Sequence, residues 1–525
     1  MRDIIKKNRV FLISTLAVVL ISALVTMAVP LYINVRLDDS SAINFETVII
    51  IIGLMMFSLA LQLALIFIRE NYAAKFNIAN FKNSCNKMFE MNYDELLKKE
   101  PTSLIERIGM LTNSVYMFIT SSFSSIVSGM LVILVSLIFI LRINIFLGLL
   151  LTIVVPVNYF GFKSINKILN KKCEVLQRST SEGYKEIIGL CKYVDFIKQT
   201  SDHSILIDKI HTPLKKIYYS MANINQFAQA SSSAIKMFNS FVQNIVLIIL
   251  YLNVVNFGQG LTALVIVSIV LPLFFGSLGG IVSTNLEVAN LRANMDFIKD
   301  EIEAAREENG TVKISSIDSI RVDLSEFYLA GNVKRVNIHA EFSKGDVVNI
   351  KGISGSGKST FIKLFLKFRG VKSIYVNQID ISQIDNESLR EKIAYVSQDT
   401  AVFPFTIREN IEIGSNKDVD WEKVSQSKLL APVLRDKTLD TRILENGANL
   451  SGGERQRIAL CRELQNTSDL IILDEITSNL DPEAAQLIYD DILEQYKDKI
   501  ILIIRHETNT TISFTKELII DLHRD

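Results

Sequence analysis

The sequence has few residues of the kinds that form disulfides or bind metal ions. Its four cysteines are scattered, with no CxxC pair and no metal-ligand spacing, and they are interpreted as reduced thiols. The five histidines are equally scattered, so no metal site is predicted from them. An excess of one charge is also lacking, because 56 Lys and Arg balance 56 Asp and Glu. A neutral chain gives no reason to expect a nucleic-acid partner or a polybasic membrane anchor.

The composition does not suit a single kind of protein. Of the 525 residues, 49% are apolar and the mean hydropathy is positive, which is too apolar for a purely soluble chain. The 21% of charged residues is too high for a purely membrane-embedded chain. Nearly all long apolar runs precede residue 285. The sequence therefore predicts a membrane part followed by a soluble part, and its length has room for both.

The first part contains six apolar runs, each close to the ~20 residues that a helix needs to cross a bilayer. They are residues 10–35, 46–68, 115–141, 143–163, 237–256 and 260–284. The first run follows three basic residues, as in a signal peptide. It is far longer than the ~7–15 apolar residues of a signal peptide, however, and it has no clean cleavage site. We therefore expect six transmembrane helices.

Loop charges predict the orientation of these helices. The N-terminal residues are basic, the loop 36–46 is acidic, and the link 256–260 is uncharged. We expect a multi-pass protein of the cell membrane with its N-terminus and its soluble part in the cytoplasm. The two loops on that side, 69–113 and 164–234, are long, of mixed charge and poor in Gly and Pro. They are predicted to continue the helices into the cytosol as stalks.

Charged side chains are absent from the apolar core of all six runs. Pumps and carriers driven by ion gradients usually need such groups in the membrane, so we expect a different energy source. The main amide side chains at membrane depth are Gln62, Asn158, Gln243 and Asn244. They either line a cavity or form hydrogen bonds between helices, and the sequence leaves both interpretations open.

The second part begins with a charged helical run at 287–309 and continues with short apolar runs of β type. These runs lie at 320–324, 347–350, 392–396, 470–473 and 500–504, with helical segments between them. Strands that alternate with helices predict a largely parallel α/β sheet. We expect a transmembrane domain with cytosolic coupling loops at 1–300, a linker at 301–314 and an α/β domain at 315–525.

The segment Gly352-Ile-Ser-Gly-Ser-Gly-Lys-Ser359 fits the phosphate-binding P-loop pattern. It follows a predicted strand and precedes a predicted helix at 360–368, as that pattern requires. Glycines let backbone N–H groups turn towards a phosphate, and the helix N-terminus adds its positive dipole. Lys358 can reach the β- and γ-phosphates of ATP, and the Ser359 hydroxyl can ligate Mg²⁺. The predicted ATP contacts are Gly352, Ser354, Gly355, Ser356, Gly357, Lys358, Ser359 and Thr360.

A second predicted strand, 470–473, ends in the two carboxylates Asp474 and Glu475. A buried strand would place Asp474 beside the P-loop, where it can hold the Mg²⁺ shell. Glu475 points elsewhere and can polarise the attacking water. Many core strands end in an acidic residue, so this pair alone is a weak indication of function. Its predicted role depends on the presence of the P-loop in the same chain.

The segment Leu450-Ser-Gly-Gly-Glu-Arg-Gln-Arg457 resembles the signature of the ATP-binding cassette of ABC transporters. Ser451, Gly452 and Gly453 open a predicted helix, 454–464, whose N-terminus offers a second anion site. In this family the two phosphate-binding helix starts belong to opposite faces of the cassette. The resemblance therefore implies that one ATP is clamped between two chains.

Further elements resemble those of the cassette and follow in the family's order. Gln398 resembles the glutamine that reaches Mg²⁺, Asp481 the aspartate of the D-loop, and His506 the histidine against the γ-phosphate. The ring that stacks on adenine is expected at Tyr328, with Phe327 as the alternative. The resemblance implies catalytic roles for Glu475, His506, Gln398 and Lys358, nucleotide contacts by Tyr328, Ser451, Gly452, Gly453 and Asp481, and Mg²⁺ ligands at Ser359, Gln398 and Asp474.

With its six predicted helices, the chain resembles half-size ABC exporters over essentially its whole length. This resemblance implies an ATPase coupled to transmembrane movement, with short coupling helices at the stalk tips near 91–98 and 182–189. It also implies a dimer. Because all motifs are intact, a second copy of the chain is favoured as the partner over a related half-transporter.

The substrate is expected to be amphipathic or apolar, because the membrane core offers few polar groups to replace lost hydration. Small drugs, lipids and peptides all fit this description. No peptidase-like domain precedes the first run, so leader-peptide cleavage is not expected. An importer on the same scaffold and a non-transporting ATP-dependent sensor are the alternative functions.

Overall fold

The computed structural model describes residues 45–191, 194–257, 261–329, 332–353, 355–370, 373–415, 418–477, 480–505 and 511–520, with some helical residues between 13 and 32. The chain divides into two units, each described here by itself. A helical unit comprises Met1–Met91 and Glu95–Arg306. The other unit comprises Asn92–Asp94 and Glu307–Asp525 and is built around two β-sheets.

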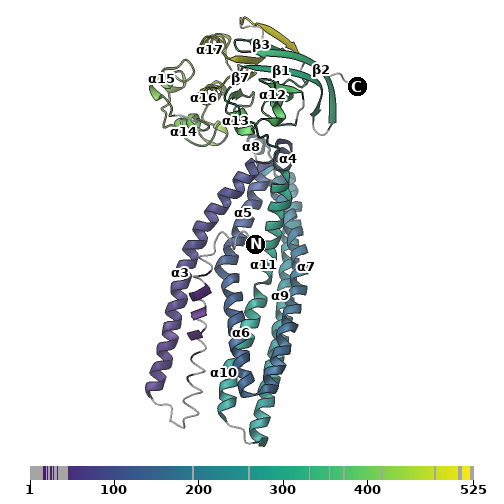
Figure 1. The fold of residues 1–525 in the computed structure, drawn as a ribbon, viewed down its shortest axis with the longest axis vertical. Helices are drawn as coiled ribbons and strands as arrows, with labels where there is room; N and C mark the ends of the chain where they lie inside the picture. Colours follow the sequence, from purple (N-terminus) through teal and green to yellow (C-terminus); the bar gives the residue numbers. More distant parts are fainter. Residues whose placement is uncertain are drawn as a thin grey trace. The chain divides into compact units, whose positions relative to one another are not determined.

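Helices, some of them long and others very short, make up the described part of the helical unit (Figure 1). They are α3 (Phe45–Phe89), α4 (Tyr93–Lys99), α5 (Pro101–Met117), η1 (Phe118–Ser122), α6 (Phe123–Ile143), α7 (Ile145–Cys191), α8 (Val194–Gln199), α9 (Ser204–Phe257), α10 (Leu261–Ser283), α11 (Asn285–Phe297), η2 (Ile298–Ile302) and η3 (Glu303–Ala305). Five helical stretches among the described residues are long and apolar enough to cross a membrane. Five of the six predicted runs fall on them, and the run 10–35 lies mostly outside the described residues.

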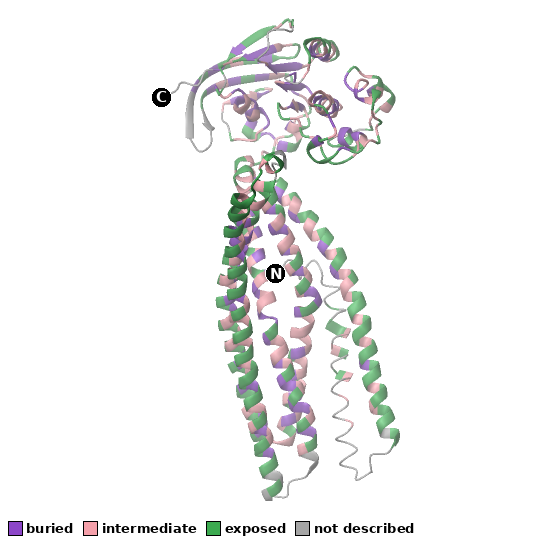
Figure 2. Ribbon diagram, turned by 180° about the vertical axis from the view of Figure 1, so that it is seen from behind, coloured by how far each residue is buried: buried purple, intermediate pink, exposed green. Residues whose placement is uncertain are grey.

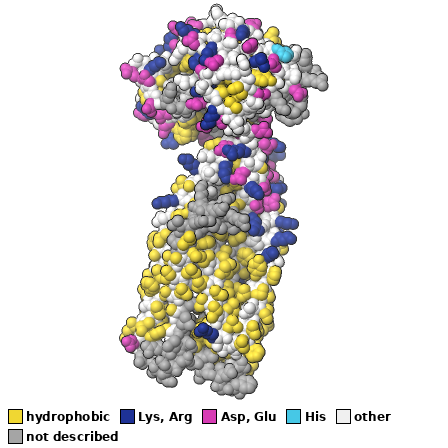
Figure 3. Space-filling view, in the orientation of Figure 1, with side chains coloured by type: hydrophobic (Ala, Val, Ile, Leu, Met, Phe, Trp, Pro, Cys, Tyr) yellow, Lys and Arg dark blue, Asp and Glu magenta, His cyan; other side chains and the backbone are white. Residues whose placement is uncertain are grey.

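The membrane helices continue well beyond the length of a bilayer. Helices α7 and α9 have 47 and 54 residues, about twice the ~20 residues that a crossing needs. Hydrophobic side chains cover one stretch of the helical unit, and charged side chains gather towards one of its ends (Figure 3). The predicted stalks are thereby confirmed as extensions of the membrane helices.

One of the two predicted coupling helices is wrong. A short helix, α4, occupies most of the first predicted segment, 91–98. Residues 182–189 form no separate helix, because they lie inside α7, and the next short helix is α8. A Cβ added to Gly183 would lie 2.7 Å from Ile217 Cδ1 of α9. This glycine therefore serves the close approach of two helices and does not break α7.

The core between helices α6, α7, α9 and α10 is largely apolar. Helices α6, α7, α9 and α10 pack through buried side chains that include Ile140, Leu151, Val246 and Phe274. Many other large apolar side chains of this unit are exposed along the outer surfaces of the helices (Figure 2). Outward-facing apolar surface of this kind is expected where lipid is the solvent.

The second unit contains a five-stranded parallel sheet in the order β6-β7-β8-β3-β9. Its strands are β3 (Val347–Lys351), β6 (Ile393–Val396), β7 (Leu470–Asp474), β8 (Ile500–Ile504) and β9 (Lys516–Ile519). Four of them match predicted strands to within one residue, so the predicted parallel sheet is confirmed. A four-stranded antiparallel sheet lies beside it in the fold, with β1 (Ser319–Leu329), β2 (Asn332–Ser343), β4 (Ile374–Val376) and β5 (Ile379–Asp380). Only part of β1 was predicted.

Helices cover both faces of the parallel sheet. They are α12 (Lys358–Phe365), α13 (Asn386–Arg390), α14 (Ile407–Glu412), α15 (Trp421–Gln426), α16 (Gly452–Glu463) and α17 (Pro482–Gln495). Successive residues of a strand face opposite sides of its sheet. Ile472 of β7 shares a buried cluster with Phe361 of α12, whereas its neighbour Ile471 shares one with Ile458 of α16. Helices α12 and α16 therefore lie against opposite faces of the sheet.

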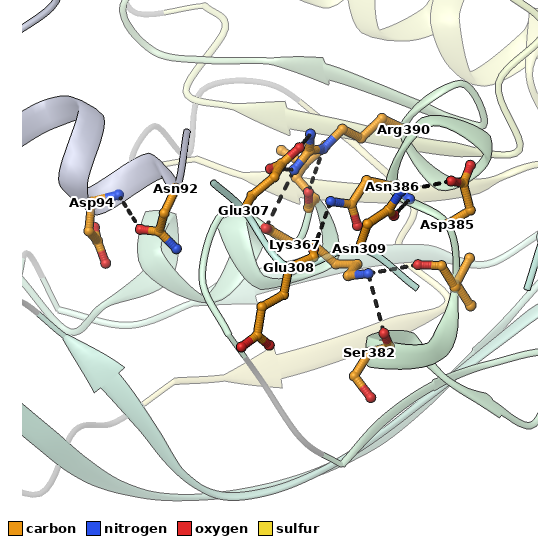
Figure 4. Close-up of polar contacts among 12 residues, drawn as sticks. Asn92, Asp94, Glu307, Glu308, Asn309, Lys367, Ser382, Asp385, Asn386 and Arg390 are labelled. Carbon is orange, nitrogen blue, oxygen red and sulfur yellow. Dashed lines mark hydrogen bonds and ion pairs between the residues drawn. The ribbon is translucent and has the colours of Figure 1, made fainter. Parts of the chain in front are cut away.

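Three segments of the second unit meet at the side chain of Arg390. Its guanidinium donates two hydrogen bonds to the carboxylate of Glu307, at 2.9 and 2.8 Å (Figure 4). The same guanidinium lies over the ring of Phe368, 5.4 Å from its centroid. Phe368 in turn stacks on Tyr93, with the ring centroids 4.9 Å apart. These contacts hold the start of the segment that follows Arg306 against the α/β core.

Candidate nucleotide-binding site

The predicted chemical groups follow the carboxyl ends of neighbouring parallel strands. The P-loop follows β3, Gln398 follows β6, and Asp474 and Glu475 stand at the end of β7. In parallel α/β sheets, ligands bind outside this edge. His506 was predicted to follow β8, which ends at Ile504, but the histidine lies outside the described residues, as does Ser354 of the P-loop.

The P-loop backbone has the conformation that its glycines permit. Gly355 and Gly357 have φ angles of 80° and 86°, which side chains with a Cβ rarely adopt. Helix α12 begins directly afterwards, at Lys358. The Lys358 ammonium donates to the carbonyl oxygens of Gly352 and Ile353, at 2.8 and 3.1 Å. The loop therefore turns tightly around its own lysine at a helix N-terminus, the arrangement that suits a phosphate group.

The carboxyl group of Asp474 is buried, and its surroundings fit a divalent cation. Its Oδ1 atom has no hydrogen-bond partner among the described residues. The Ser359 hydroxyl lies near enough to the carboxyl group to lower its pKa, against the larger effect of burial. The Tyr395 hydroxyl donates to its Oδ2 at 3.5 Å. Burial raises the pKa of Asp474 because a carboxylate loses hydration there. A cation held by Asp474 and Ser359 would satisfy the orphaned oxygen.

Glu475 differs from its neighbour in both environment and backbone. Its side chain is half-buried, and its Oε2 accepts a hydrogen bond of 2.7 Å from Gln398 Nε2. Its φ angle is 53°, in the left-handed region that is uncommon for residues other than glycine. Strained residues of this kind cluster at active sites. The turn aims the two adjacent carboxylates at different partners, Asp474 at Ser359 and Glu475 at Gln398.

The signature segment forms the capped start of α16. The Ser451 hydroxyl accepts a hydrogen bond from the Glu454 N–H, and Glu454 accepts one from the Ser451 N–H at 2.7 Å. Lys437 lies 2.5 Å from the Glu454 carboxylate and lowers its pKa, although partial burial opposes this shift. Gly452 and Gly453 are the first two residues of α16. This helix N-terminus is thus fixed in place, and its first two residues carry no side chain.

Two further predicted contacts are placed less directly by the structure. Asp481 is the N-cap of α17 and accepts a hydrogen bond of 2.8 Å from the Ala484 N–H, which gives it a structural role of its own. Tyr328 and Phe327 are in β1, opposite Val333 and Lys334 of β2. Their side chains lie outside what the structure describes, so the choice between them stays open.

Sequence reasoning missed the part played by Tyr395. Its ring is largely buried, and its hydroxyl contacts the Asp474 carboxyl. Burial, with the nearby carboxylate as the second cause, raises the pKa of Tyr395, so the hydroxyl stays protonated and acts as a donor. The available signal was the position of Tyr395 in the strand next to the one that ends in Asp474.

Comparisons with known proteins agree with this geometry. Residues 336–478 match the profile of the family described as ABC transporter. A sublancin-168-processing and transport ATP-binding protein of Bacillus subtilis is 28% identical over 391 residues, which are 71% of this chain and 54% of that protein. An ATP-dependent lipid A-core flippase of Vibrio parahaemolyticus is 36% identical over 220 residues, which are 40% of this chain and 38% of that protein. These matches span about half or less of each relative.

A solved structure matches over both parts of the chain. A bacterial Atm1-family ABC exporter with ATP bound has a TM-score of 0.81, covering 100% of this chain and 95% of that one at 20% identity. The fold is therefore that of membrane helices followed by an ATP-binding cassette. Residues 336–478 therefore match the cassette of ABC transporters, and the chain is similar in fold over its whole length to an exporter in which one chain carries both parts. This protein is a multi-pass membrane protein with an ATP-binding domain.

Proposed function

We propose that this protein hydrolyses ATP to export or flip an amphipathic or apolar substrate across the cell membrane. One observation carries the proposal: P-loop, strand-end carboxylates and signature helix occur in a chain whose described residues also include five helical stretches apolar enough to span a bilayer. The transmembrane domain is assigned to 1–300, the linker to 301–314 and the nucleotide-binding domain to 315–525. The charge pattern of the loops supports a cytoplasmic cassette and N-terminus.

In this proposal the described residues have distinct roles. Lys358 and the P-loop N–H groups hold the β- and γ-phosphates. Ser359, Asp474 and Gln398 hold Mg²⁺, which when bound neutralises charge on the phosphate oxygens. Glu475 accepts a proton from the attacking water and orients it, with Gln398 positioned against its carboxylate at 2.7 Å. His506 is assigned to the γ-phosphate by its predicted place after β8.

The active protein is proposed to be a dimer of two copies that share their ATP sites. The P-loop helix α12 and the signature helix α16 lie against opposite faces of one sheet, which supports their use in two different sites. ATP bound by Lys358 of one chain would then meet Ser451 of the other. Closing and opening of the cassettes would switch the membrane helices between inward-facing and outward-facing states.

Mixed dimers test the shared sites. Lys358→Ala chains and Ser451→Arg chains carry different tags, and dimers that contain one of each are isolated. Shared sites predict one doubly damaged and one undamaged site in each mixed dimer, with normal nucleotide affinity at the latter. Sites confined to single chains predict two singly damaged sites instead. Finding no site of normal affinity in the mixed dimers would contradict the proposal.

Substrate class is tested by ATPase activity in nanodiscs. We expect saturable stimulation by amphipathic lipids, peptides or drugs, and none by hydrophilic solutes matched in size. Transport measured in oriented vesicles distinguishes export from import, and absence of any flux would indicate a sensor. Saturable stimulation by the hydrophilic set alone would contradict the proposed substrate class.

A further inference from the structure

A cavity lies within the helical unit, between α5, α7 and the continuous helix formed by α11 and η2. Its volume is about 180 Å³. It is lined by Arg107, Asn170, Lys171, Glu174, Arg178, Arg292, Ala293, Asp296, Phe297, Asp300 and Glu301. Charged side chains dominate the lining, with four basic and four acidic residues, whereas the packed interior of the same unit nearer the membrane is apolar.

The buried base of this cavity is Arg107 of α5. Only 6% of the residue is exposed, and its Nε and Nη1 atoms have no hydrogen-bond partner among the described residues. One face of the guanidinium lies 4.0 Å from the centroid of the Phe297 ring. Arginine remains charged in proteins, and a buried charge without a hydrogen-bonded counterion is costly. The N–H groups on the guanidinium edge therefore lack an acceptor, and an oxyanion would supply both the acceptor and the opposite charge.

The nearest carboxylates do not supply that anion. Within the described residues, no carboxylate oxygen lies within 4.0 Å of the Arg107 guanidinium nitrogens. Glu301 pairs with Lys99 at 2.7 Å, and Glu174 pairs with Arg178 at 2.8 Å. Both acids thus have a cation of their own and act on Arg107 only through space, without a hydrogen bond to it.

A second polar group on the cavity wall lacks a partner. The Oδ1 atom of Asn170 on α7 is buried and accepts no hydrogen bond from the described residues. An amide carbonyl of this kind can accept a hydrogen bond from a protonated or hydroxyl group of a ligand. Arg107 on α5 and Asn170 on α7 therefore both line the cavity, and each carries a buried polar atom without a partner among the described residues.

The position of the cavity along the helices favours a ligand from water over one from the bilayer. Arg107, Asn170 and Arg292 lie about seven or eight residues beyond the nearest ends of the predicted membrane runs. At about 1.5 Å per helical residue, the cavity begins roughly 10 Å outside the apolar spans. A lipid headgroup would have to leave the interface to reach it.

We propose that this cavity binds a small water-soluble solute that carries a single carboxylate or phosphate group, with Arg107 as the anchor. The planar guanidinium matches both kinds of oxyanion through paired N–H donors. The remaining lining includes as many acids as bases, so a polyanion such as a nucleotide is disfavoured. The lining residues all belong to the helical unit and lie outside its apolar, membrane-spanning stretches. They come from the stalk segments of three different membrane helices.

Binding is tested on the full-length protein in nanodiscs of zwitterionic lipid at constant ionic strength. The cassette sites are first saturated with a non-hydrolysable ATP analogue, because a P-loop also accepts phosphate. Inorganic phosphate and propionate, which carries one carboxylate, are then titrated separately by calorimetry. We expect saturable binding of one or both, weakened about tenfold or more by Arg107→Gln, since a charged hydrogen bond is worth about 1.5–3 kcal/mol. Binding of neither anion would overturn the proposal.

Two further variants make the result specific. Lys167→Gln removes an exposed positive charge from α7 outside the cavity lining, and it should leave the affinity unchanged. Ala293→Met keeps every charge but fills part of the cavity, and it should weaken binding even if Arg107→Gln fails to fold. Equal losses in Lys167→Gln and Arg107→Gln, unchanged affinity in Ala293→Met, or binding only when phosphatidic acid is added to the nanodiscs would each contradict a built site for a soluble anion.

Discussion

The cassette buries its Ile and Leu side chains, whereas the helical unit exposes many side chains of the same types. In the cassette, all five residues of β7 and all five of β8 are buried, and both strands are rich in Ile and Leu. In the helical unit, residues such as Ile153 of α7 and Leu134 of α6 are mostly exposed. Water as solvent forces apolar side chains inward, whereas lipid accepts them on the outside. An exposed apolar side chain is therefore unfavourable in the cassette, which is surrounded by water, but not on a helix that is surrounded by lipid.

Polar groups differ between the units in a corresponding way. The cassette gathers its reactive groups where backbone geometry supports them, at strand ends and helix starts. In the membrane-spanning part of the helical unit, the two buried amides Asn158 and Asn239 are hydrogen-bonded to each other. Only beyond the apolar spans do charges accumulate, around Arg107 and its neighbours. Substitution of polar residues in the cassette should therefore lower the rate of ATP hydrolysis. Substitution of polar residues among the membrane helices should instead weaken helix packing.

The largest effect is expected from Glu475→Gln in the cassette. The change removes the carboxylate that is proposed to act on the attacking water but keeps the shape of the side chain. General-base catalysis contributes about 10²–10⁴ in rate, so steady-state ATPase turnover should fall by that factor while ATP binding persists. Turnover and nucleotide affinity are measured on the reconstituted full-length protein.

A matched variant controls for the loss of one negative charge. Glu494→Gln changes an exposed carboxylate on α17 and should leave turnover unaltered. Near-normal ATPase activity in Glu475→Gln would remove Glu475 from the proposed mechanism. A fall in ATP affinity together with turnover would instead assign it to binding.

The second largest effect is expected on stability, and it should differ between an apolar side chain buried in the cassette and one that faces lipid. Ile472→Ala in β7 creates a cavity in a fully buried sheet and should cost about 2–5 kcal/mol of stability. Ile153→Ala on the outer face of α7 leaves no cavity and should change stability by about 0.5 kcal/mol or less. Thermal unfolding of both variants is compared in nanodiscs. Equal losses would mean that the outer face of α7 is covered by protein rather than lipid.

The parts of the fold that were predicted from sequence are those with a local signal. The strands β3, β7 and β8 are short apolar runs, and the membrane helices are long ones, so each could be predicted to within a few residues. The strand β2 was missed because only continuous apolar runs were predicted as strands, whereas its buried residues Val336, Ile338 and Phe342 alternate with polar ones. Its pairing with β1 depends on a partner that local composition does not reveal.

Contacts between distant segments were also beyond prediction. Gly183 was expected near a separate coupling helix, but its lack of a side chain serves the packing of α7 on α9. The residue types of the candidate site were recognised from motifs, whereas the hydrogen bond between Gln398 and Glu475 joins residues 77 positions apart. The role proposed for Arg107 could not be predicted from the sequence, because it depends on the burial of this side chain between segments that are distant in the sequence.

The smallest effect concerns the amides at membrane depth, for which the sequence left two interpretations open. The structure favours hydrogen bonds between helices for Asn158, because Asn158 and Asn239 are buried and donate to each other at 2.9 and 3.0 Å. Such bonds in membranes are worth about 0.6 kcal/mol on average, and at most about 1.7. Asn158→Leu and Asn239→Leu should each destabilise the protein by about that amount, since each leaves one amide unpaired.

The double variant Asn158→Leu/Asn239→Leu decides between the interpretations, because it removes both partners and leaves no unpaired amide between α7 and α9. It should recover most of the stability lost in the single variants, and substrate-stimulated ATPase activity should recover with it. Asn244→Leu, an exposed amide on α9, serves as the control and should not couple to Asn158→Leu. If the amides instead line a substrate cavity, substrate stimulation will fall in the double variant at least as far as in the single ones, and the thermal unfolding temperatures will show no coupling. That result would assign Asn158 a role in substrate binding and not in helix packing. Polar residues among the membrane helices would then contribute directly to function, as they do in the cassette.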